Sequence, residues 1–362
     1  MSELAARLLR RIARQGPITV AEYLAEALTH PRDGYYMSGD PFGARGDFVT
    51  APEISQMFGE LIGLWCAETW QRFGAPAALT LVELGPGRGT LMADLLRAAR
   101  VLPEFRDALD LHLVEVSPAL RALQARSLAG TPAAWHDSLA EVPEGRPLLV
   151  VANEFFDALP VRQFERTPEG WRERLVGLAP EGDALAFGLS PPAPHAEALL
   201  PEAPRGAGPG AVAEVAPAAL SLAAEIGRRL VTDGGAALIV DYGYAVPDGR
   251  PTLQALRRHA AQDVLAEPGL ADLTAHVDFG ALARAAREAG AEAWGPVTQG
   301  DFLEALGIAA RAEALAAGAD PEQAAEIRAA RRRLTAREEM GVLFKVLGLA
   351  APGLGPLAGC AA

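Results

Sequence analysis

Short apolar runs alternate with helix-length segments in the middle of this chain, and this alternation restricts the fold more than any other feature. The apolar runs span residues 79–84, 111–116, 148–152 and 236–240, and segments of helical length, 90–100 and 118–128, lie between the first three. A continuous apolar run is typical of a strand covered on both faces. Strands joined by helices form a parallel sheet with right-handed crossovers. We therefore predict an α/β doubly wound sheet that binds ligands at the carboxyl ends of its strands.

The rest of the chain adds segments around this predicted core. We expect an N-terminal helical and lid segment over 1–75 and a core over 76–298 with an insertion at about 158–212. A helical addition over 299–338 should pack on the N-terminal helices, and the last core strand, at 341–347, and the tail should together span 339–362. Leu4, Leu8 and Ile12 recur at helical spacing and predict the inward face of a first helix. Within the insertion, residues 162–166 and 171–176 flank a Thr-Pro-Glu-Gly turn and predict a hairpin, followed by an irregular, mobile stretch.

Charge and cysteine content argue against several classes of protein. The chain has 33 basic and 46 acidic residues, a net charge of −13, which argues against non-specific nucleic-acid binding. Since no run of about twenty apolar residues lacks charge or proline, we expect no membrane insertion. Cys66 and Cys360 lack metal-ligand spacing, so we expect no metal site and a reducing compartment. Glu3 and the scarcity of hydroxyl residues argue against a mitochondrial presequence, so we expect a cytoplasmic, bacterial-type protein.

A glycine-rich turn follows the first predicted strand. Gly85, Gly87 and Gly89 alternate between Glu83 and Thr90, directly before a helix. Glycine permits a tight turn and lets a ligand approach the backbone. Thr90 stands where a dinucleotide fingerprint requires a third small residue, and the Lys-Ser/Thr pair of a Walker loop is missing. The acid two positions before the first glycine resembles motif I of class I S-adenosylmethionine (SAM) methyltransferases. A turn for another nucleotide, or a plain strand-to-helix joint, stays the alternative.

Acidic residues also stand at the ends of the next two predicted strands. Glu115 ends the second strand, where a carboxylate can accept hydrogen bonds from both ribose hydroxyls of a nucleotide. Asp137 follows the strand-like stretch 133–136, where it can accept from an adenine amino group. Either acid alone is also typical of a helix N-terminus. Their occurrence at consecutive strand ends favours nucleotide binding.

The fourth predicted strand runs into the sequence Asn-Glu-Phe-Phe-Asp-Ala-Leu-Pro, which starts at Asn153. Asn153, Glu154 and Asp157 therefore stand at the strand end, beside the predicted methyl donor. The cost of desolvating these carboxylates is offset if they face a cation, either the sulfonium or a guanidinium substrate. A structural alternative is that Asn153 and Asp157 cap turns while Phe155 and Phe156 lie in the core.

Five blocks of sequence, taken together, resemble the MidA family, the DUF185 group that includes the mitochondrial complex I assembly methyltransferases. The blocks are 46–60, 83–90, 153–160, 241–244 and 274–279, and they follow the family order over nearly the whole chain. The resemblance implies a Rossmann-like class I methyltransferase sheet, mostly parallel with helices on both faces, with added N-terminal and C-terminal helical elements and SAM as cofactor. It also implies protein arginine methylation to symmetric dimethylarginine, on a respiratory NADH dehydrogenase subunit in the mitochondrial members.

The resemblance further assigns roles to individual residues. It implies that the three turn glycines line the methionine part of SAM, that Glu83 lies near its ammonium group and that Glu115 holds the ribose. Thr50, Pro52 and Glu53 fall in the block that should close over the cofactor, and Asn153 is placed with the cofactor-binding residues. Residues 177–212 do not align with the family. The paired-glutamate hairpin of better-known arginine methyltransferases is missing, so arginine specificity rests on analogy.

Methyl transfer needs alignment of donor and acceptor and no nucleophilic side chain. With an arginine acceptor, carboxylates localise the guanidinium charge and later receive a proton. We predict Glu154 and Asp157 as this clamp, with Glu53 and His276 as secondary candidates. His276 is equally consistent with a structural role, because Asp278 has the position of an N-cap for the helix that follows, 279–289. Phe48 and Phe155 are candidates for cation-π contact with the sulfonium.

Three functions are consistent with these residues. The leading hypothesis is a SAM-dependent protein arginine methyltransferase with an arginine-bearing protein as partner. The second is a SAM-binding assembly chaperone that grips a partner subunit and has little catalysis. The third, a dinucleotide-dependent oxidoreductase, is disfavoured by Thr90 and by the lack of a second nucleotide-type motif.

Overall fold

The computed structural model describes residues 2–37, 50–192, 200, 206–257 and 260–361. The chain divides into two compact units, each built from separated stretches of sequence. Unit 1 comprises residues 1–48, 157–221 and 245–281, and unit 2 comprises residues 49–156, 222–244 and 282–362. The segments predicted from sequence are continuous, whereas each unit combines three separated stretches of the chain.

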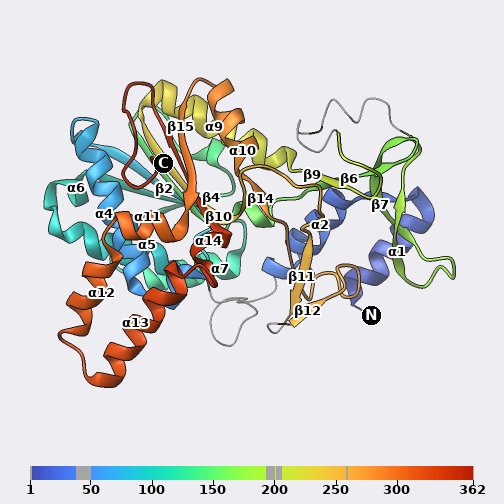
Figure 1. Cartoon of the computed structure of the whole chain (residues 1–362), viewed down its shortest axis with the longest axis horizontal. Helices are drawn as coiled ribbons and strands as arrows, with labels where there is room; N and C mark the ends of the chain where they lie inside the picture. Colours follow the sequence, from blue (N-terminus) through green and yellow to red (C-terminus); the bar gives the residue numbers. More distant parts are fainter. Residues whose placement is uncertain (1, 38–49, 193–199, 201–205, 258–259, 362) are drawn as a thin grey trace. The chain divides into compact units, whose positions relative to one another are not determined.

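Unit 2 contains the predicted sheet (Figure 1). Its strands are β2 Leu79–Leu84, β3 Leu109–Val114, β4 Ala134–His136, β5 Leu148–Asn153, β10 Gly235–Tyr244, β15 Glu292–Thr298 and β16 Phe344–Ala350. They lie in the order β15-β16-β10-β5-β2-β3-β4. From β10 to β4 all neighbours are parallel, whereas β16 pairs antiparallel with β10 and with β15. The fold class predicted from the apolar runs is therefore confirmed.

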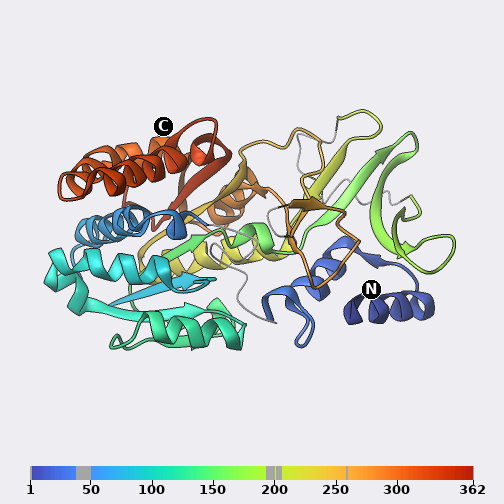
Figure 2. The same ribbon diagram turned by 90° about the horizontal axis from the view of Figure 1, so that it is seen from below.

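Helices cover both faces of this sheet, which is why its central strands are buried and mostly apolar (Figure 2). Every residue of β2 and of β5 is buried. The helices of unit 2 are α3 Ala51–Ile54, α4 Gln56–Arg72, α5 Thr90–Ala98, α6 Pro103–Ala108, α7 Pro118–Ser127, α11 Gln299–Ala305, α12 Ile308–Ala316, α13 Pro321–Thr335 and α14 Met340–Leu343, with most of α9 Pro217–Asp233 and α10 Phe279–Glu288.

The predicted helical addition packs as expected on helices from the first 75 residues. α12 lies against α4, and α13 lies against α3. Arg311 on α12 donates through Nε to Oε2 of Glu60 on α4 at 2.8 Å, and Arg97 on α5 donates to Oε1 of the same carboxylate at 3.0 Å. Two guanidinium partners lower the pKa of the Glu60 carboxyl although burial opposes the shift. This ion-pair network joins three helices on one side of the sheet.

The predicted limits of the strands β3 and β16 are wrong, and β10 extends beyond its predicted limits, 236–240. β3 runs from Leu109 to Val114 instead of 111–116, so Glu115 follows the strand instead of ending it. The start was missed because the polar residue Asp110 interrupts the apolar run, although it pairs in register with Thr80 of β2. The last strand begins at Phe344 instead of residue 341, because residues Met340–Leu343 form the short helix α14.

In the part that the structure describes, unit 1 combines an N-terminal pair of helices with two small sheets. The helices are α1 Glu3–Gln15 and α2 Val20–Thr29, and Leu4, Leu8 and Ile12 of α1 are buried as predicted. One sheet has the order β1-β7-β6-β9, with β8 paired to β7, and the other has the order β12-β11-β13. Their strands are β1 Ile18–Thr19, β6 Arg162–Thr167, β7 Gly170–Leu178, β8 Leu185–Leu189, β9 Val212–Val215, β11 Gln254–Arg257, β12 Ala260–Gln262 and β13 Asp272–Thr274; the short strand β14 is Val277–Asp278.

The insertion after residue 158 supplies much of the first of these sheets. The predicted hairpin is confirmed, because β6 and β7 pair with Arg166 opposite Trp171. The prediction of an irregular stretch after the hairpin is wrong in part, because β8 forms there and pairs with β7 along five positions. The composition of residues 177–212 concealed this strand, since proline and alanine around it give no alternating pattern.

Candidate functional site

The glycine turn of unit 2 connects β2 to α5. Gly85, Gly87 and Gly89 have φ angles of 61°, 53° and 80°, a left-handed conformation that side chains with a Cβ rarely adopt. A Cβ on Gly85 would lie 2.6 Å from Cδ2 of Phe155, so the turn also packs closely on the segment after β5. The turn places backbone amides at the N-terminus of α5, where the helix dipole favours an anionic group such as a carboxylate.

Glu83 stands in β2, two residues before this turn. Its side chain is buried, and its Oε2 atom has no hydrogen-bond partner among the described residues. Burial, with a smaller contribution from the charge of Glu115, raises the pKa of Glu83 to about 8. A buried carboxyl oxygen without a partner is costly. Its chemistry fits the cationic ammonium group of SAM, which would supply that partner.

Glu115 follows β3, the parallel neighbour of β2. Its Oε1 accepts a hydrogen bond of 2.8 Å from the Ser117 amide, and its Oε2 accepts one of 3.2 Å from Nε2 of Gln124. Burial raises the pKa of this carboxyl. Because two carboxylate oxygens offer about four acceptor sites, the side chain is held in place and can still accept from sugar hydroxyls. This geometry fits the predicted ribose contact.

Asp137 follows β4, and its side chain is 70% exposed and paired with a cation. Nη2 of Arg121 donates to Oδ1 of Asp137 at 2.5 Å, and Nε of Arg121 donates to the main-chain carbonyl of Glu115 at 2.6 Å. Arg121 therefore bridges the ends of two neighbouring strands, a role that the sequence analysis missed. The contact between Asp137 and adenine stays a prediction.

The end of β5 brings together an amide and a carboxylate. Asn153 is the last residue of the strand, and its Oδ1 is buried without a partner among the described residues. Its Nδ2 donates to Oε1 of Glu154 at 3.2 Å, and the amide of Ala51 donates to the same oxygen at 2.9 Å. Glu154 thus lies at the carboxyl end of the sheet and contacts the first turn of α3.

Asp241 supports the same loop from the neighbouring strand β10. Its side chain is fully buried, and its Oδ2 accepts from the amides of Phe155 at 3.2 Å and Phe156 at 3.0 Å. Its Oδ1 accepts from the amide of Tyr242 at 2.9 Å. Asp241 begins one of the five family blocks, 241–244, but its sequence position alone predicts no role for it. A charged residue directly after five buried apolar residues of a strand was the signal that could have identified it.

The helix α3 carries three predicted site residues. Thr50 is the N-cap, Pro52 is buried in the first turn, and Glu53 reaches the glycine turn. Oε1 of Glu53 accepts from Oγ1 of Thr90 at 2.5 Å, and Oε2 accepts from Nη1 of Arg88 at 3.4 Å. Glu53 therefore braces the turn and the start of α5. Phe48 lies outside the described residues, so its predicted contact with the sulfonium stays a prediction.

Asp157 and His276 belong to unit 1. Asp157 is buried, and its carbonyl accepts from the amide of Ala275 at 3.0 Å. The amide of His276 donates to Oγ1 of Thr252 at 2.9 Å. Oδ1 of Asp278 accepts from the amide of Ala281 at 2.8 Å, so the predicted N-cap is confirmed, and the helix ends at Glu288. Because Glu154 belongs to unit 2, the clamp of Glu154 with Asp157 stays a prediction.

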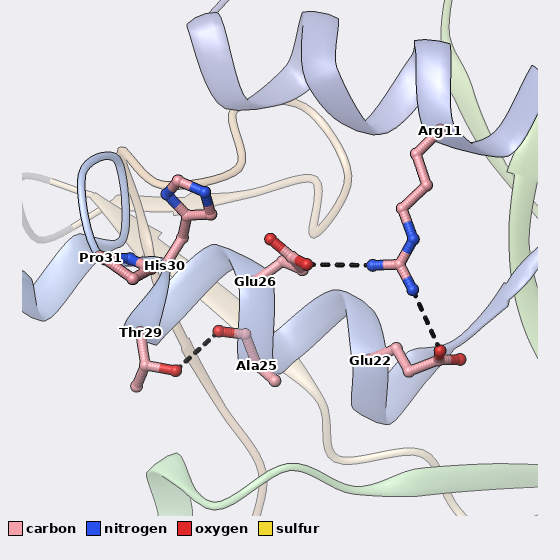
Figure 3. A pocket seen from close by; sticks show the side chains of 7 residues that line it. All are labelled: Arg11, Glu22, Ala25, Glu26, Thr29, His30 and Pro31. Atoms are coloured by element: carbon pink, nitrogen blue, oxygen red, sulfur yellow. Dashed lines mark hydrogen bonds and ion pairs between the residues drawn. The ribbon is translucent and has the colours of Figure 1, made fainter.

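Unit 1 also has a pocket of about 370 Å³ between α1 and α2 (Figure 3). Its main charges neutralise one another, since Arg11 donates to Glu26 at 3.0 Å and to Glu22 at 3.2 Å. The seven lining residues include no predicted site residue. In the part of the chain that the structure describes, no helix is long and apolar enough to cross a bilayer, and no three potential metal ligands cluster.

Comparison with known proteins identifies the family of this chain. Residues 61–297 match a family described as S-adenosyl-L-methionine-dependent methyltransferase. The chain is 44% identical to "Protein arginine methyltransferase NDUFAF7, mitochondrial" of Mus musculus, over 85% of this chain and 75% of the relative. It is 41% identical to the protein of the same name from Danio rerio, over 93% and 84% of the two chains. Because these relatives are mitochondrial by name, the expectation of a cytoplasmic protein is corrected.

A solved structure supports the cofactor directly. A Burkholderia thailandensis protein, crystallised with S-adenosylhomocysteine (SAH), superimposes with a TM-score of 0.85 at 33% identity, over 98% of this chain and 94% of that one. SAH is the product that SAM leaves after methyl transfer, so the cofactor prediction and the class I methyltransferase fold are both confirmed. The chain belongs to the MidA family of SAM-dependent methyltransferases.

Proposed function

We propose that this chain methylates arginine side chains of a protein, with symmetric dimethylarginine as the product. The observation that carries the proposal is the position of Glu154, whose carboxylate is held at the carboxyl end of β5 by Ala51 and Asn153. A carboxylate there can bind a guanidinium group beside the cofactor. The names of the mouse and zebrafish relatives support arginine as the acceptor.

SAM, when bound, supplies the reactive methyl group on a sulfonium. The residues of the chain would hold and orient it: Glu83 its ammonium group, Glu115 its ribose and the glycine turn its methionine part. Glu154 would orient the acceptor guanidinium and localise its charge. When a guanidinium nitrogen bonds to the methyl carbon and the carbon–sulfur bond breaks, one proton must leave that nitrogen, and in this proposal Glu154 receives it.

The substrate that we propose is a basic segment of a partner protein, with a respiratory NADH dehydrogenase subunit as the first candidate. A net charge of −13 favours encounter with a basic partner through long-range attraction. We further propose Asp157 as a second carboxylate of the clamp and His276 as a positioning residue. Both proposals come from sequence and need direct tests.

The test is methyl transfer from radiolabelled SAM into the proteins of a cell extract that lacks this protein. We expect label in a protein band and, after acid hydrolysis, in symmetric dimethylarginine. Glu154→Ala should remove the label while SAM still binds. Binding of SAM without any transfer would favour the assembly chaperone, and label in another amino acid would contradict arginine as the acceptor.

A further inference from the structure

Gln124 of α7 is fully buried and makes three hydrogen bonds, although the sequence analysis gave it no role. Its Nε2 donates to the carbonyl of Gly87 at 2.8 Å and to Oε2 of Glu115 at 3.2 Å. Its Oε1 accepts from Nε1 of Trp135 on β4 at 2.9 Å. One side chain therefore contacts the glycine turn, the acid after β3 and the neighbouring strand.

The chemistry of the partners determines how this amide is oriented. The indole N–H of Trp135 can only donate, so it requires the amide oxygen, whereas the Gly87 carbonyl and the Glu115 carboxylate accept and require the amide nitrogen. Both amide hydrogens are used. Methionine, leucine and ionised glutamate cannot replace this pattern, because none of them has two donors on one atom. A buried glutamine with every bond satisfied is stabilising only while all three partners remain.

The helix α7 has a second contact with the same turn. Oγ of Ser127 donates to the carbonyl of Arg88 at 2.7 Å, next to the carbonyl that Gln124 binds. A Cβ on Gly89 would lie 3.4 Å from Cα of Gln124, so the turn already lies in contact with the helix backbone. Ser127 thus binds the turn alone, whereas Gln124 binds both the turn and Glu115.

We propose that Gln124 is a positioning residue for SAM: it holds the turn and the Glu115 carboxylate in one fixed arrangement. The ribose end and the methionine end of the cofactor site are then set by a single side chain. Without Gln124, the Ser117 amide still binds Oε1 of Glu115, but Oε2 loses the donor that orients it toward the sugar. The proposal rests on the proposed contact of Glu115 with ribose.

The experiment compares two ligands by isothermal titration calorimetry: SAH and its 2′,3′-dideoxy analogue, which lacks both ribose hydroxyls. For Gln124→Met we expect the Kd of SAH to rise about tenfold, the size of one lost hydrogen bond to a charged group. The analogue should lose less affinity, because it makes no ribose contact with Glu115. The preference for SAH over the analogue should therefore fall at least about threefold.

Ser127→Ala is the matched control, since Ser127 lies on the same helix and binds the neighbouring turn carbonyl. Ser127→Ala should change the Kd of SAH and the Kd of the analogue by the same factor, so the preference for SAH over the analogue should stay as in the wild-type protein. The proposal is wrong if Gln124→Met binds SAH with unchanged affinity. It is also wrong if Gln124→Met loses the same affinity for both ligands while Glu115→Gln lowers the preference for SAH over the analogue. If Glu115→Gln keeps the preference, the ribose assignment fails and this inference fails with it. Both results are independent of the proposed arginine methylation, because the binding experiment does not measure methyl transfer.

A second variant keeps the test decisive if Gln124→Met does not fold. Trp135→Phe removes the indole donor that fixes the amide orientation and leaves the contacts of Gln124 with Gly87 and Glu115 chemically possible. We expect the preference for SAH to fall in this variant as well, by a smaller factor. A preference equal to that of the wild-type protein would contradict the proposal.

Discussion

The amide of Ala51 donates a hydrogen bond of 2.9 Å to the carboxylate of Glu154, so the first turn of α3 is joined to the end of β5. Glu154 adopts φ = 50°, a conformation that is uncommon for a residue with a side chain. Such a conformation persists where the surroundings determine it, as at many functional sites. The bonds from Ala51 and Asn153 provide that support.

Replacement of Glu154 should separate catalysis from cofactor binding. We expect Glu154→Ala to keep the Kd of SAM within about threefold and to lower kcat at least a hundredfold, the usual contribution of a group that transfers a proton. Glu154→Gln keeps an oxygen that can accept from Ala51, so it should hold α3 in place and still lose turnover. Methyl transfer at a normal rate by Glu154→Ala would remove this residue from the catalytic set.

Binding of SAM should release a proton and strengthen as pH rises toward 8. The pKa of Glu83 is about 8 without ligand, so this carboxyl is mostly protonated at pH 7. A cationic ligand favours the ionised form, so affinity should rise about tenfold per pH unit below pH 8 and level off above it. Calorimetry in buffers with different ionisation enthalpies measures the number of protons released when SAM binds. Glu83→Gln should release none, and an equal pH dependence in that variant would contradict the assignment.

The same carboxyl should destabilise the ligand-free protein at high pH. Its folded pKa of about 8 lies above the unfolded value near 4.3, so between these values the folded state binds the extra proton and stability falls as pH rises. Glu83→Gln lacks this dependence and should unfold about 6 °C higher than the wild-type protein at pH 8. The difference should vanish near pH 4. Thermal unfolding across this range checks it, and a less stable variant at pH 8 would contradict the predicted cost of burial.

A side chain in the glycine turn should prevent cofactor binding. Gly87→Val is strained by a φ of 53° and adds bulk where the ligand meets the backbone, so we expect at least a hundredfold loss of SAH affinity. Gly130→Val is the control, because Gly130 has φ = 87° and nothing within 4 Å of its Cβ position. The control should lose similar stability and still bind SAH. Normal affinity in Gly87→Val would argue against the site.

The parallel sheet and the acids at its edge followed from sequence because their signals are local. β2 is apolar at every position except Thr80 and Glu83, and Glu83 stands two residues before a glycine turn. Glu115 follows the neighbouring strand at the same edge. A buried strand, a turn glycine and an acid at a strand end each leave a pattern within a few residues.

The residues that connect the site left no such pattern. Gln124 stands in an ordinary helical segment, and its three partners are 9 to 37 residues away in sequence. Arg121 looks like an exposed helical arginine until Glu115 and Asp137 lie beside it. Unit 1 likewise gathers three separated stretches of the chain through packing that no local signal encodes. Tertiary contacts of this kind require the structure.

A crystal structure of this chain with SAH shows whether the glycine turn holds the cofactor. We predict SAH at the turn formed by Gly85, Gly87 and Gly89, with its ammonium group within hydrogen-bond distance of Glu83 and both ribose hydroxyls on Glu115. The bonds from Gln124 to Gly87 and Glu115 should remain. SAH bound at another place, or bound at the turn with its ribose away from Glu115, would contradict the account.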